Sequence, residues 1–296
     1  MELYSPFVPR FSLIVATVER STELSVLLHS LAMQKLRDFE LIIVDQNSDD
    51  RLLPLIKEWT SATVGPNDDG ARSIQVKHLR CEPGVSRARN LGLLNCTGEI
   101  LVFPDDDCWY FPDTLQKVDI WFREHVNYGI LSLGSRDEKG EVSGNRWVQQ
   151  ECDLTRTNVF RASATYTYFI RRPIDMTSLR FDESLGPAAG TAYGCGEDTD
   201  LLLTLMTGGI RGRFNSLLYV GHPLKMGFVN VQRAKRYGGG FGRVLAKHSN
   251  PLLFCGLVIF DFARAALRLL IGDRQGASRF WAHANGMIQA YFSRNV

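Results

Sequence analysis

Three adjacent carboxylates, Asp105, Asp106 and Asp107, come directly after an apolar run that predicts a buried strand over 99–103. Burying three like charges together is unfavourable unless a cation or hydrogen-bond donors neutralise them. Because alternate side chains of an extended segment point the same way, Asp105 and Asp107 can share one hard ion such as Mn²⁺ or Mg²⁺. The alternative is an acidic loop exposed to solvent, but the position at the end of a buried strand favours a metal site.

A second acidic cluster, Glu197, Asp198 and Asp200, opens a helical pattern that continues through 201–206. A helix N-terminus stabilises a carboxylate and can lower its pKa. An N-cap with acidic neighbours would account for one of these carboxylates but not for all three. The functional alternative is a general base that takes the proton of an alcohol nucleophile.

Two arginines, Arg87 and Arg89, lie in a helix predicted over 84–95. Residues two apart do not share a helix face, so at most one of the two can point into a site. The planar guanidinium of arginine is suited to hold a phosphate or a nucleotide.

The elements that must position these groups alternate between apolar β-rich runs and helical patterns. The predicted strands cover 11–16, 39–44, 74–79 and 99–103. This alternation predicts an α/β fold with a mostly parallel central sheet that helices cover on both faces. Ligands of such sheets lie outside the carboxyl ends of the strands. Two acidic clusters, at 45–50 and 105–107, follow strand ends, which favours a binding site there over plain surface charge.

The composition is that of a globular chain. The 296 residues include 34 basic and 32 acidic ones, and 45% are hydrophobic, which excludes a disordered or collagen-like chain. No apolar run reaches the ~18 residues of a plain membrane-spanning helix. The N-terminus shows no basic stretch followed by an apolar core, so no signal peptide is expected. The six cysteines are scattered without a CxxC pair, which fits reduced thiols in the cytoplasm.

The charge is divided unevenly along the chain. Residues 1–232 hold 24 basic and 30 acidic residues, whereas 233–296 hold 10 basic and 2 acidic ones. We therefore expect a catalytic domain over 1–232 and, over 233–296, a basic loop followed by amphipathic helices. The cationic tail indicates an anionic partner such as a membrane surface, a nucleic acid or a phosphorylated substrate, or else it is a solvated face. Its glycine-rich stretch 236–243 predicts a flexible segment that either closes over a diphosphate or is a linker.

Within this tail, a helix is predicted over 251–271, between an Asn-Pro start and Gly272. Its charged residues, Asp261, Arg264 and Arg268, fall in one narrow stripe, and most other positions are apolar. This pattern predicts a helix that lies in a membrane interface with its arginines toward the headgroups. The alternative is a helix that packs on the catalytic domain through its apolar face.

Taken in order, these pieces resemble the family 2 glycosyltransferases of GT-A fold, over about residues 10–225. The resemblance rests on five motifs. They are the opening strand and Thr-x-Asn-Arg turn at 11–20, the second strand and acidic turn at 40–50, the Gly-x-x-x-Ala-Arg-Asn-x-Gly helix at 84–92, the DxD segment at 103–112, and the acceptor-side motifs at 181–183 and 196–198. Each motif alone is weak, but five in this order are specific.

The resemblance implies roles for individual residues. The nucleotide-sugar pocket would be formed by Thr17, Glu19, Asp45, Gln46, Arg89, Asp105 and Asp106. The divalent ion, Mn²⁺ or Mg²⁺, would be held by Asp105, Asp107 and His222, with a structural role for His222 as the alternative. Asp198 would be the catalytic base, and Glu197 would touch the acceptor. Gln46 stands where many members have an aspartate that reads uracil, so the base stays open, with a UDP-sugar as the first expectation.

These features lead us to expect a metal-dependent, inverting glycosyltransferase that moves a sugar from a nucleoside-diphosphate sugar to a hydroxyl of a lipid-linked glycan in surface polysaccharide synthesis. The enzyme would be cytoplasmic and peripheral, with its tail on the anionic inner face of the cell membrane, and would bind no nucleic acid. The alternatives are a non-catalytic nucleotide-sugar binder and a nucleic-acid-binding protein that uses the basic tail. A nucleotidyltransferase would need a glycine-rich triphosphate loop, and none follows the first strand.

Overall fold

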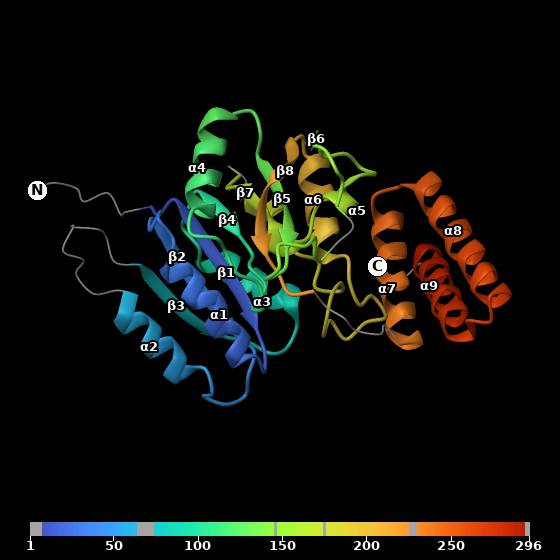
Figure 1. Cartoon of the computed structure of the whole chain (residues 1–296), viewed down its shortest axis with the longest axis horizontal. Helices are drawn as coiled ribbons and strands as arrows, with labels where there is room; N and C mark the ends of the chain where they lie inside the picture. Colours follow the sequence, from blue (N-terminus) through green and yellow to red (C-terminus); the bar gives the residue numbers. More distant parts are fainter. Residues whose placement is uncertain (1–7, 64–73, 145–146, 174–175, 225–229, 294–296) are drawn as a thin grey trace, which may run out of the picture. The chain divides into compact units, whose positions relative to one another are not determined.

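The computed structural model describes residues 8–63, 74–144, 147–173, 176–224 and 230–293. Figure 1 shows the order of the helices and strands in this part of the chain. They are β1 (Phe11–Thr17), α1 (Ser21–Ala32), β2 (Phe39–Asp45), α2 (Leu53–Thr63), β3 (Gln75–Arg80), α3 (Val85–Asn95), β4 (Ile100–Val102), α4 (Thr114–Glu124), β5 (Ile130–Arg136), β6 (Cys152–Asp153), α5 (Val159–Ala162), η1 (Thr165–Thr167), β7 (Tyr168–Arg171), η2 (Met176–Ser178), α6 (Glu197–Thr207), β8 (Gly212–Gly221), α7 (Val231–Lys247), α8 (Pro251–Leu270) and α9 (Arg274–Phe292).

The chain divides into two compact units. The first comprises 1–83, 87–180 and 208–225, and it holds the strands named above. The second comprises 84–86, 181–207 and 226–296, and it holds α6, α7, α8 and α9. The boundary that we predicted between residues 232 and 233 falls within α7, and the division into functional domains stays a prediction.

The strands described in the first unit form one sheet in the order β3-β2-β1-β4-β7-β5-β8-β6. β1 lies parallel to β2 and β4, β2 lies parallel to β3, and β5 lies parallel to β8. β7 and β6 run antiparallel to their neighbours. The sheet is therefore mostly parallel, as the alternation of patterns predicted.

The strands at the centre of the sheet are buried because they are almost continuously apolar. All seven residues of β2, with the sequence FELIIVD, are buried, which is typical of a strand covered on both faces. α1 packs four leucines on this core at the spacing of one helix face: Leu24, Leu27, Leu28 and Leu31. This core fixes the carboxyl ends of β1, β2 and β4, where the acidic clusters lie.

In the second unit, α7 and α9 pack closely, and glycines make the close approach possible. Four glycines of α7 are buried: Gly238, Gly239, Gly240 and Gly242. A Cβ on Gly238 would lie 1.9 Å from the carbonyl oxygen of His283 in α9, so a side chain does not fit there. The prediction of a flexible glycine-rich segment over 236–243 is therefore wrong, because this stretch is the middle of a helix and neither a closing loop nor a linker.

The polar stripe of α8 faces α9. Asp261 is buried, and its carboxylate lies 2.5 Å from Nδ1 of His283. The guanidinium of Arg264 lies 4.1 Å from the ring centroid of Phe280. The predicted orientation of Arg264 toward lipid headgroups is therefore wrong: helical spacing identified the stripe correctly but not the side that is turned outward.

The outer face of α8 is apolar and exposed. It includes Leu252, Ile259 and Leu270, which are 88%, 67% and 83% exposed. The helix begins at Pro251 as predicted, and the side chain of Asn250 accepts the N–H of Leu253. Within the part of the chain that the structure describes, no helix is both long and apolar enough to cross a membrane.

Candidate active site

Asp106 joins the segment after β4 to the end of β1. Its carboxylate accepts hydrogen bonds from the Thr17 hydroxyl and the Arg20 guanidinium, both at 2.9 Å. Burial raises the pKa of Asp106 to about 6, and the positive charge of Arg20 opposes that rise. These contacts hold the ends of two strands together, and a direct part for Asp106 in nucleotide binding stays a prediction.

Arg20 bridges two of the three aspartates. Its Nη1 lies 2.9 Å from an oxygen of Asp106 and 3.0 Å from an oxygen of Asp107. The three charges therefore fix one another at the edge of the sheet. No spacing in the sequence singles out Arg20, and the available signal was its place at the end of the turn after β1.

Asp105, Asp107 and His222 form a cluster in which each residue offers one ligand atom, and these atoms lie within 4.8 Å of one another. Two chain segments bring them together. Trp109 and Gly221 exchange backbone hydrogen bonds at 3.0 and 2.8 Å, which sets Asp107 beside His222. The Oδ1 atom of Asp107 lies 3.5 Å from Nε2 of His222. The structure thus gathers the three residues that we predicted as metal ligands.

The imidazole of His222 is held in an orientation that suits a metal ligand. Its Nδ1 lies 2.8 Å from the carbonyl oxygen of Pro223, and its ring stacks on Tyr166 with the centroids 4.4 Å apart. A proton on Nδ1 satisfies that carbonyl and leaves Nε2 with its lone pair toward Asp107. Two acceptors that face each other across 3.5 Å favour a cation between them. The donor set of two carboxylates and one imidazole fits Mn²⁺, because Mg²⁺ prefers oxygen ligands.

One of the two arginines of α3 points toward this cluster. The side chain of Arg89 is 5% exposed, and its Nη2 lies 3.0 Å from Asp105. Arg87 is exposed. Arg89 and not Arg87 therefore faces the cluster, in agreement with the helix spacing, which allowed at most one of them to do so.

The end of β2 is organised around Asp45. Its carboxylate is fully buried and accepts two hydrogen bonds from Asn47, at 2.8 and 2.7 Å. It also lies 3.1 Å from Nε2 of His78 in β3. Neither Asn47 nor His78 stood out in the sequence, although Asn47 lies within the acidic turn that carries the family resemblance.

Asn47 also holds the turn after β1. Its side-chain oxygen accepts the backbone N–H of Glu19 at 2.8 Å. Glu19 has a φ of +60°, in the left-handed region that costs a residue other than glycine about 1 kcal/mol or more. The N–H of Gln46 donates to the carbonyl of Thr17 at 3.0 Å. The residues predicted for the nucleotide pocket at the ends of β1 and β2 therefore lie together.

In the second unit, α6 begins with the other acidic cluster. Asp200 is 1% exposed and pairs with Lys247 and His248, both at 2.8 Å, so it joins α6 to the end of α7. Asp198 accepts the N–H of Thr199 at 2.7 Å, and Glu197 is buried. The ion pair with Lys247 gives Asp200 a structural role. Asp198 therefore remains the candidate base.

Residues 12–181, more than half of the chain, match the pattern of Glycosyl transferase family 2. The chain belongs to this family. The family resemblance seen in the motifs is thereby confirmed. The predicted GT-A fold is also confirmed, because solved structures of glycosyltransferases share this fold over nearly the whole chain.

Two of these structures hold nucleotide sugars. The mannosyltransferase PcManGT from Pyrobaculum calidifontis, in complex with GDP-Man and Mn²⁺, covers 98% of this chain and 89% of its own, with a TM-score of 0.62 and 16% identity. TarS 1–349 from Staphylococcus aureus, in complex with UDP-GlcNAc, covers 95% of this chain and 91% of its own, with a TM-score of 0.56 and 18% identity. At these identities the likeness concerns the fold alone.

Curated relatives match a shorter stretch. A PGL/p-HBAD biosynthesis glycosyltransferase of Mycobacterium tuberculosis is 36% identical over 118 residues, which are 40% of this chain and 43% of the relative. The poly(ribitol-phosphate) beta-N-acetylglucosaminyltransferase TarS of Staphylococcus aureus is 28% identical over 125 residues, which are 41% of this chain and 20% of the relative. The match thus spans less than half of either relative.

Proposed function

We propose that the chain is a metal-dependent, inverting glycosyltransferase that moves a sugar from a nucleoside-diphosphate sugar to a hydroxyl of a glycan. The observation that carries this proposal is the cluster of Asp105, Asp107 and His222 beyond the carboxyl ends of β4 and β8. In α/β sheets this edge is where ligands bind. Arg20 and Arg89 pair with the aspartates and keep them in place.

The chemistry is divided between the two acidic clusters. Asp105, Asp107 and His222 would hold a divalent cation, which would supply Lewis-acid stabilisation of the leaving diphosphate. Asp198 takes the proton of the acceptor hydroxyl onto its carboxylate as the hydroxyl oxygen attacks the anomeric carbon. The bond to the diphosphate breaks in the same displacement, so the configuration at the anomeric carbon inverts. Glu197 precedes Asp198 in the first turn of α6 and contacts the acceptor.

The donor that we propose is a UDP-sugar, held by Arg89, Asp105 and the residues at the ends of β1 and β2. Two neighbours in fold support a nucleoside-diphosphate sugar, one solved with UDP-GlcNAc and the other with GDP-Man. The acceptor that we propose is a lipid-linked glycan in surface polysaccharide synthesis. The names of the relatives support glycoconjugate acceptors, since they refer to PGL/p-HBAD biosynthesis and to poly(ribitol-phosphate).

We further propose that the outer face of α8 binds the anionic inner surface of the cell membrane from the cytoplasm. The face is apolar, and it belongs to a tail with 10 basic and 2 acidic residues. Exposed apolar area with surrounding positive charge is typical of interfacial helices.

Sedimentation of the full chain with lipid vesicles tests the membrane proposal. The chain should pellet with vesicles that contain phosphatidylglycerol and less with pure phosphatidylcholine. The double variant Ile259→Gln/Leu270→Gln should remain in the supernatant. Leu94→Gln is the matched control, because Leu94 is equally apolar and is 84% exposed on α3. Equal pelleting of both variants would contradict the assignment to α8.

Thermal stabilisation tests the donor site. We would measure the shift with UDP, GDP, TDP and CDP, each with Mn²⁺ and with EDTA, and then transfer or hydrolysis of the matching nucleotide sugars. The proposal predicts a shift for one diphosphate that EDTA and Asp107→Asn abolish. Asp198→Asn should keep the shift and lose transfer. A shift in the wild type without transfer or hydrolysis would identify a non-catalytic binder, and no shift together with no turnover would overturn the proposal.

A further inference from the structure

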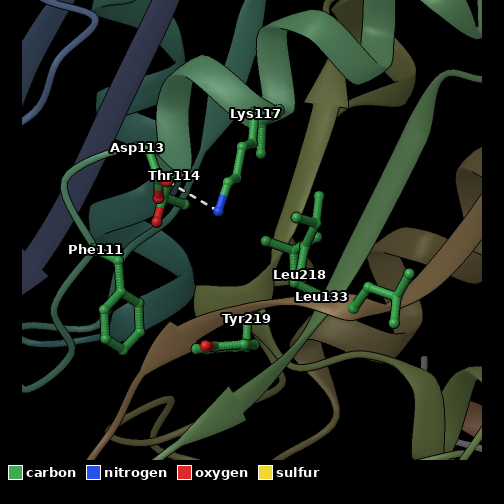
Figure 2. Close-up of a pocket in the computed structure, with 9 residues that line it drawn as sticks. Phe111, Asp113, Thr114, Lys117, Leu133, Leu218 and Tyr219 are labelled. Carbon is green, nitrogen blue, oxygen red and sulfur yellow. Dashed lines mark ion pairs between the residues drawn. The ribbon is translucent and has the colours of Figure 1, made fainter.

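A hollow on the first unit lies between the first turn of α4 and the strands β5 and β8, and it is drawn in Figure 2. Its volume is about 290 Å³, near the lower end of the range for small-molecule sites. The residues that carry the argument are Phe111, Asp113, Lys117, Leu133, Leu218 and Tyr219. In Figure 2, Lys117 extends from α4 with its amino group turned to Asp113, and Leu218 and Tyr219 lie across the hollow from α4. The roles assigned above do not involve this hollow.

The hollow exists because β8 is interrupted opposite β5. Leu133 pairs with Asn215, but the next residue, Gly134, pairs with Tyr219, so residues 216–218 stand outside the ladder. The side-chain oxygen of Asn215 accepts the N–H groups of Leu217 and Leu218, at 2.9 and 3.1 Å. The bulge is thus held by its own hydrogen bonds. Bulges often lie beside functional sites because they redirect side chains.

Asp113 departs from the usual role of an aspartate at its position. It is the N-cap residue of α4, where an aspartate side chain normally accepts an N–H of the first turn. Its side chain makes no capping bond and instead pairs with Lys117 at 2.9 Å, at the edge of the hollow. The hydrogen bond from Lys117 lowers the pKa of Asp113. The ion pair thus takes the place of the cap and sets a carboxylate and an ammonium group side by side at the edge of the hollow.

Tyr219 forms an aromatic wall that is held from two sides. The ring of Phe111 meets it at 81°, with the centroids 5.2 Å apart. The guanidinium of Arg136 lies 4.9 Å from the centre of the Tyr219 ring. Tyr219 is nevertheless 39% exposed, so a ligand can reach the ring. The hollow therefore combines a rigid aromatic surface with a carboxylate and an ammonium group.

We propose that this hollow binds one pyranose ring, as a subsite for the acceptor glycan away from the reacting hydroxyl. A pyranose offers a C–H face for Tyr219 and Phe111. It also offers hydroxyl groups that donate to Asp113 and accept from Lys117. The paired charges cancel, which disfavours a phosphate group. Covering the ion pair with an acyl chain would cost the hydration of both charges.

The subsite is connected to the metal cluster through one short ribbon. Segment 107–111 runs from Asp107 to Phe111, and segment 219–222 runs from Tyr219 to His222, with the Trp109–Gly221 bridge between them. Each extended residue advances about 3.3 Å, so the hollow lies at most about 13 Å from Asp107 along the ribbon. An acceptor of more than one sugar unit would span a separation of this size. This step rests on the proposed function.

Saturation-transfer NMR on the full chain tests the inference with methyl glycosides of glucose, galactose, mannose and N-acetylglucosamine. At least one should give signals, and its affinity should fall at least tenfold in Tyr219→Ala and in Lys117→Met. Ile120→Ala is the matched control, because Ile120 is an exposed residue of α4 that does not line the hollow. Circular dichroism would verify that each variant is folded.

The outcomes separate this inference from the proposed function. No signal from any glycoside, or equal signals in the wild type and both hollow variants, overturns the subsite even if a nucleoside diphosphate still stabilises the chain with Mn²⁺. A third outcome is that glycoside signals depend on Tyr219 and Lys117 although no nucleoside diphosphate stabilises the chain. The hollow would then be a saccharide site, but not the acceptor subsite of a glycosyltransferase.

Discussion

The packing of α7 on α9 can be tested by replacing Gly238 with alanine. The added methyl group should lower the stability of the fold there, whereas the same change at a helical glycine with open surroundings should raise it. Replacing glycine with alanine in a helix normally stabilises by about 0.5–1 kcal/mol, because glycine has more conformational freedom to lose on folding. At Gly238 the new Cβ would lie 1.9 Å from the carbonyl oxygen of His283. Overpacking a close-packed interior by an added methyl group costs about 1–3 kcal/mol. Because a backbone carbonyl cannot turn aside, we expect the clash to outweigh the helical gain, so that Gly238→Ala destabilises by about 1–2 kcal/mol.

Gly256 in α8 is the matched control. Among the described residues, no atom outside the adjacent residues and the helix's own nearby backbone lies within 4 Å of a Cβ built there. Gly256→Ala should therefore stabilise by about 0.5–1 kcal/mol. Urea unfolding followed by circular dichroism measures both changes as shifts of the midpoint at constant slope. A Gly238→Ala variant as stable as the wild type would refute the packing of α7 on α9 and restore the loop that the sequence suggested.

Three further predictions follow from single contacts. Asp198→Asn should lower transfer by about 10²-fold or more, measured as release of the nucleoside diphosphate, while nucleotide binding persists; unchanged transfer would exclude Asp198 as the base. Burial alone would raise the pKa of Glu40, but hydrogen bonds, above all the one from Lys77, outweigh it and lower the pKa. The ionised carboxylate therefore stabilises the fold at pH values above its unfolded pKa, and this stabilisation is lost as the pH falls. Urea midpoints between about pH 3 and 6 should therefore depend less on pH in Glu40→Gln, and an unchanged slope would contradict this account. Arg20→Met should lower stability by about 1–3 kcal/mol, because it removes the cation beside a buried carboxylate. Asp106 already has a pKa of about 6, so the loss should be larger at high pH than at low pH, and thermal melts that show the reverse would contradict its cause.

The sheet could be predicted because the sequences of its central strands show that these strands are buried. A strand covered on both faces is a continuous apolar run, and β2 shows this pattern. Asp105 and Asp107 were paired on the assumption of an extended segment, whereas the two lie together because residues 106 and 107 form a turn. His222 came from the family resemblance, because no local pattern shows that β8 ends beside the aspartates. Arg20 was not predicted, because its partners lie 86 and 87 residues away in the chain.

The errors in the C-terminal part have one physical origin. Local patterns show which residues share a face or lack a side chain, but not which surface packs against that face. The glycines of 236–243 indicated flexibility, whereas in α7 they allow α9 to approach closely. The stripe of Asp261 and Arg264 indicated a polar face turned outward. In the structure Asp261 contacts His283 of α9, and Arg264 contacts Phe280 of α9. The hollow beside Tyr219 had no sequence signal, because a bulge is defined by pairing between strands.

The central claim is that Asp105, Asp107 and His222 hold a divalent cation on the diphosphate of a donor. Electron paramagnetic resonance of free Mn²⁺ measures this directly when the chain is titrated with and without UDP. We predict that the wild type binds Mn²⁺ more tightly when UDP is present. Asp107→Asn and His222→Phe should each weaken the binding at least tenfold. Equal Mn²⁺ binding by the wild type and both variants, with UDP present, would contradict the account.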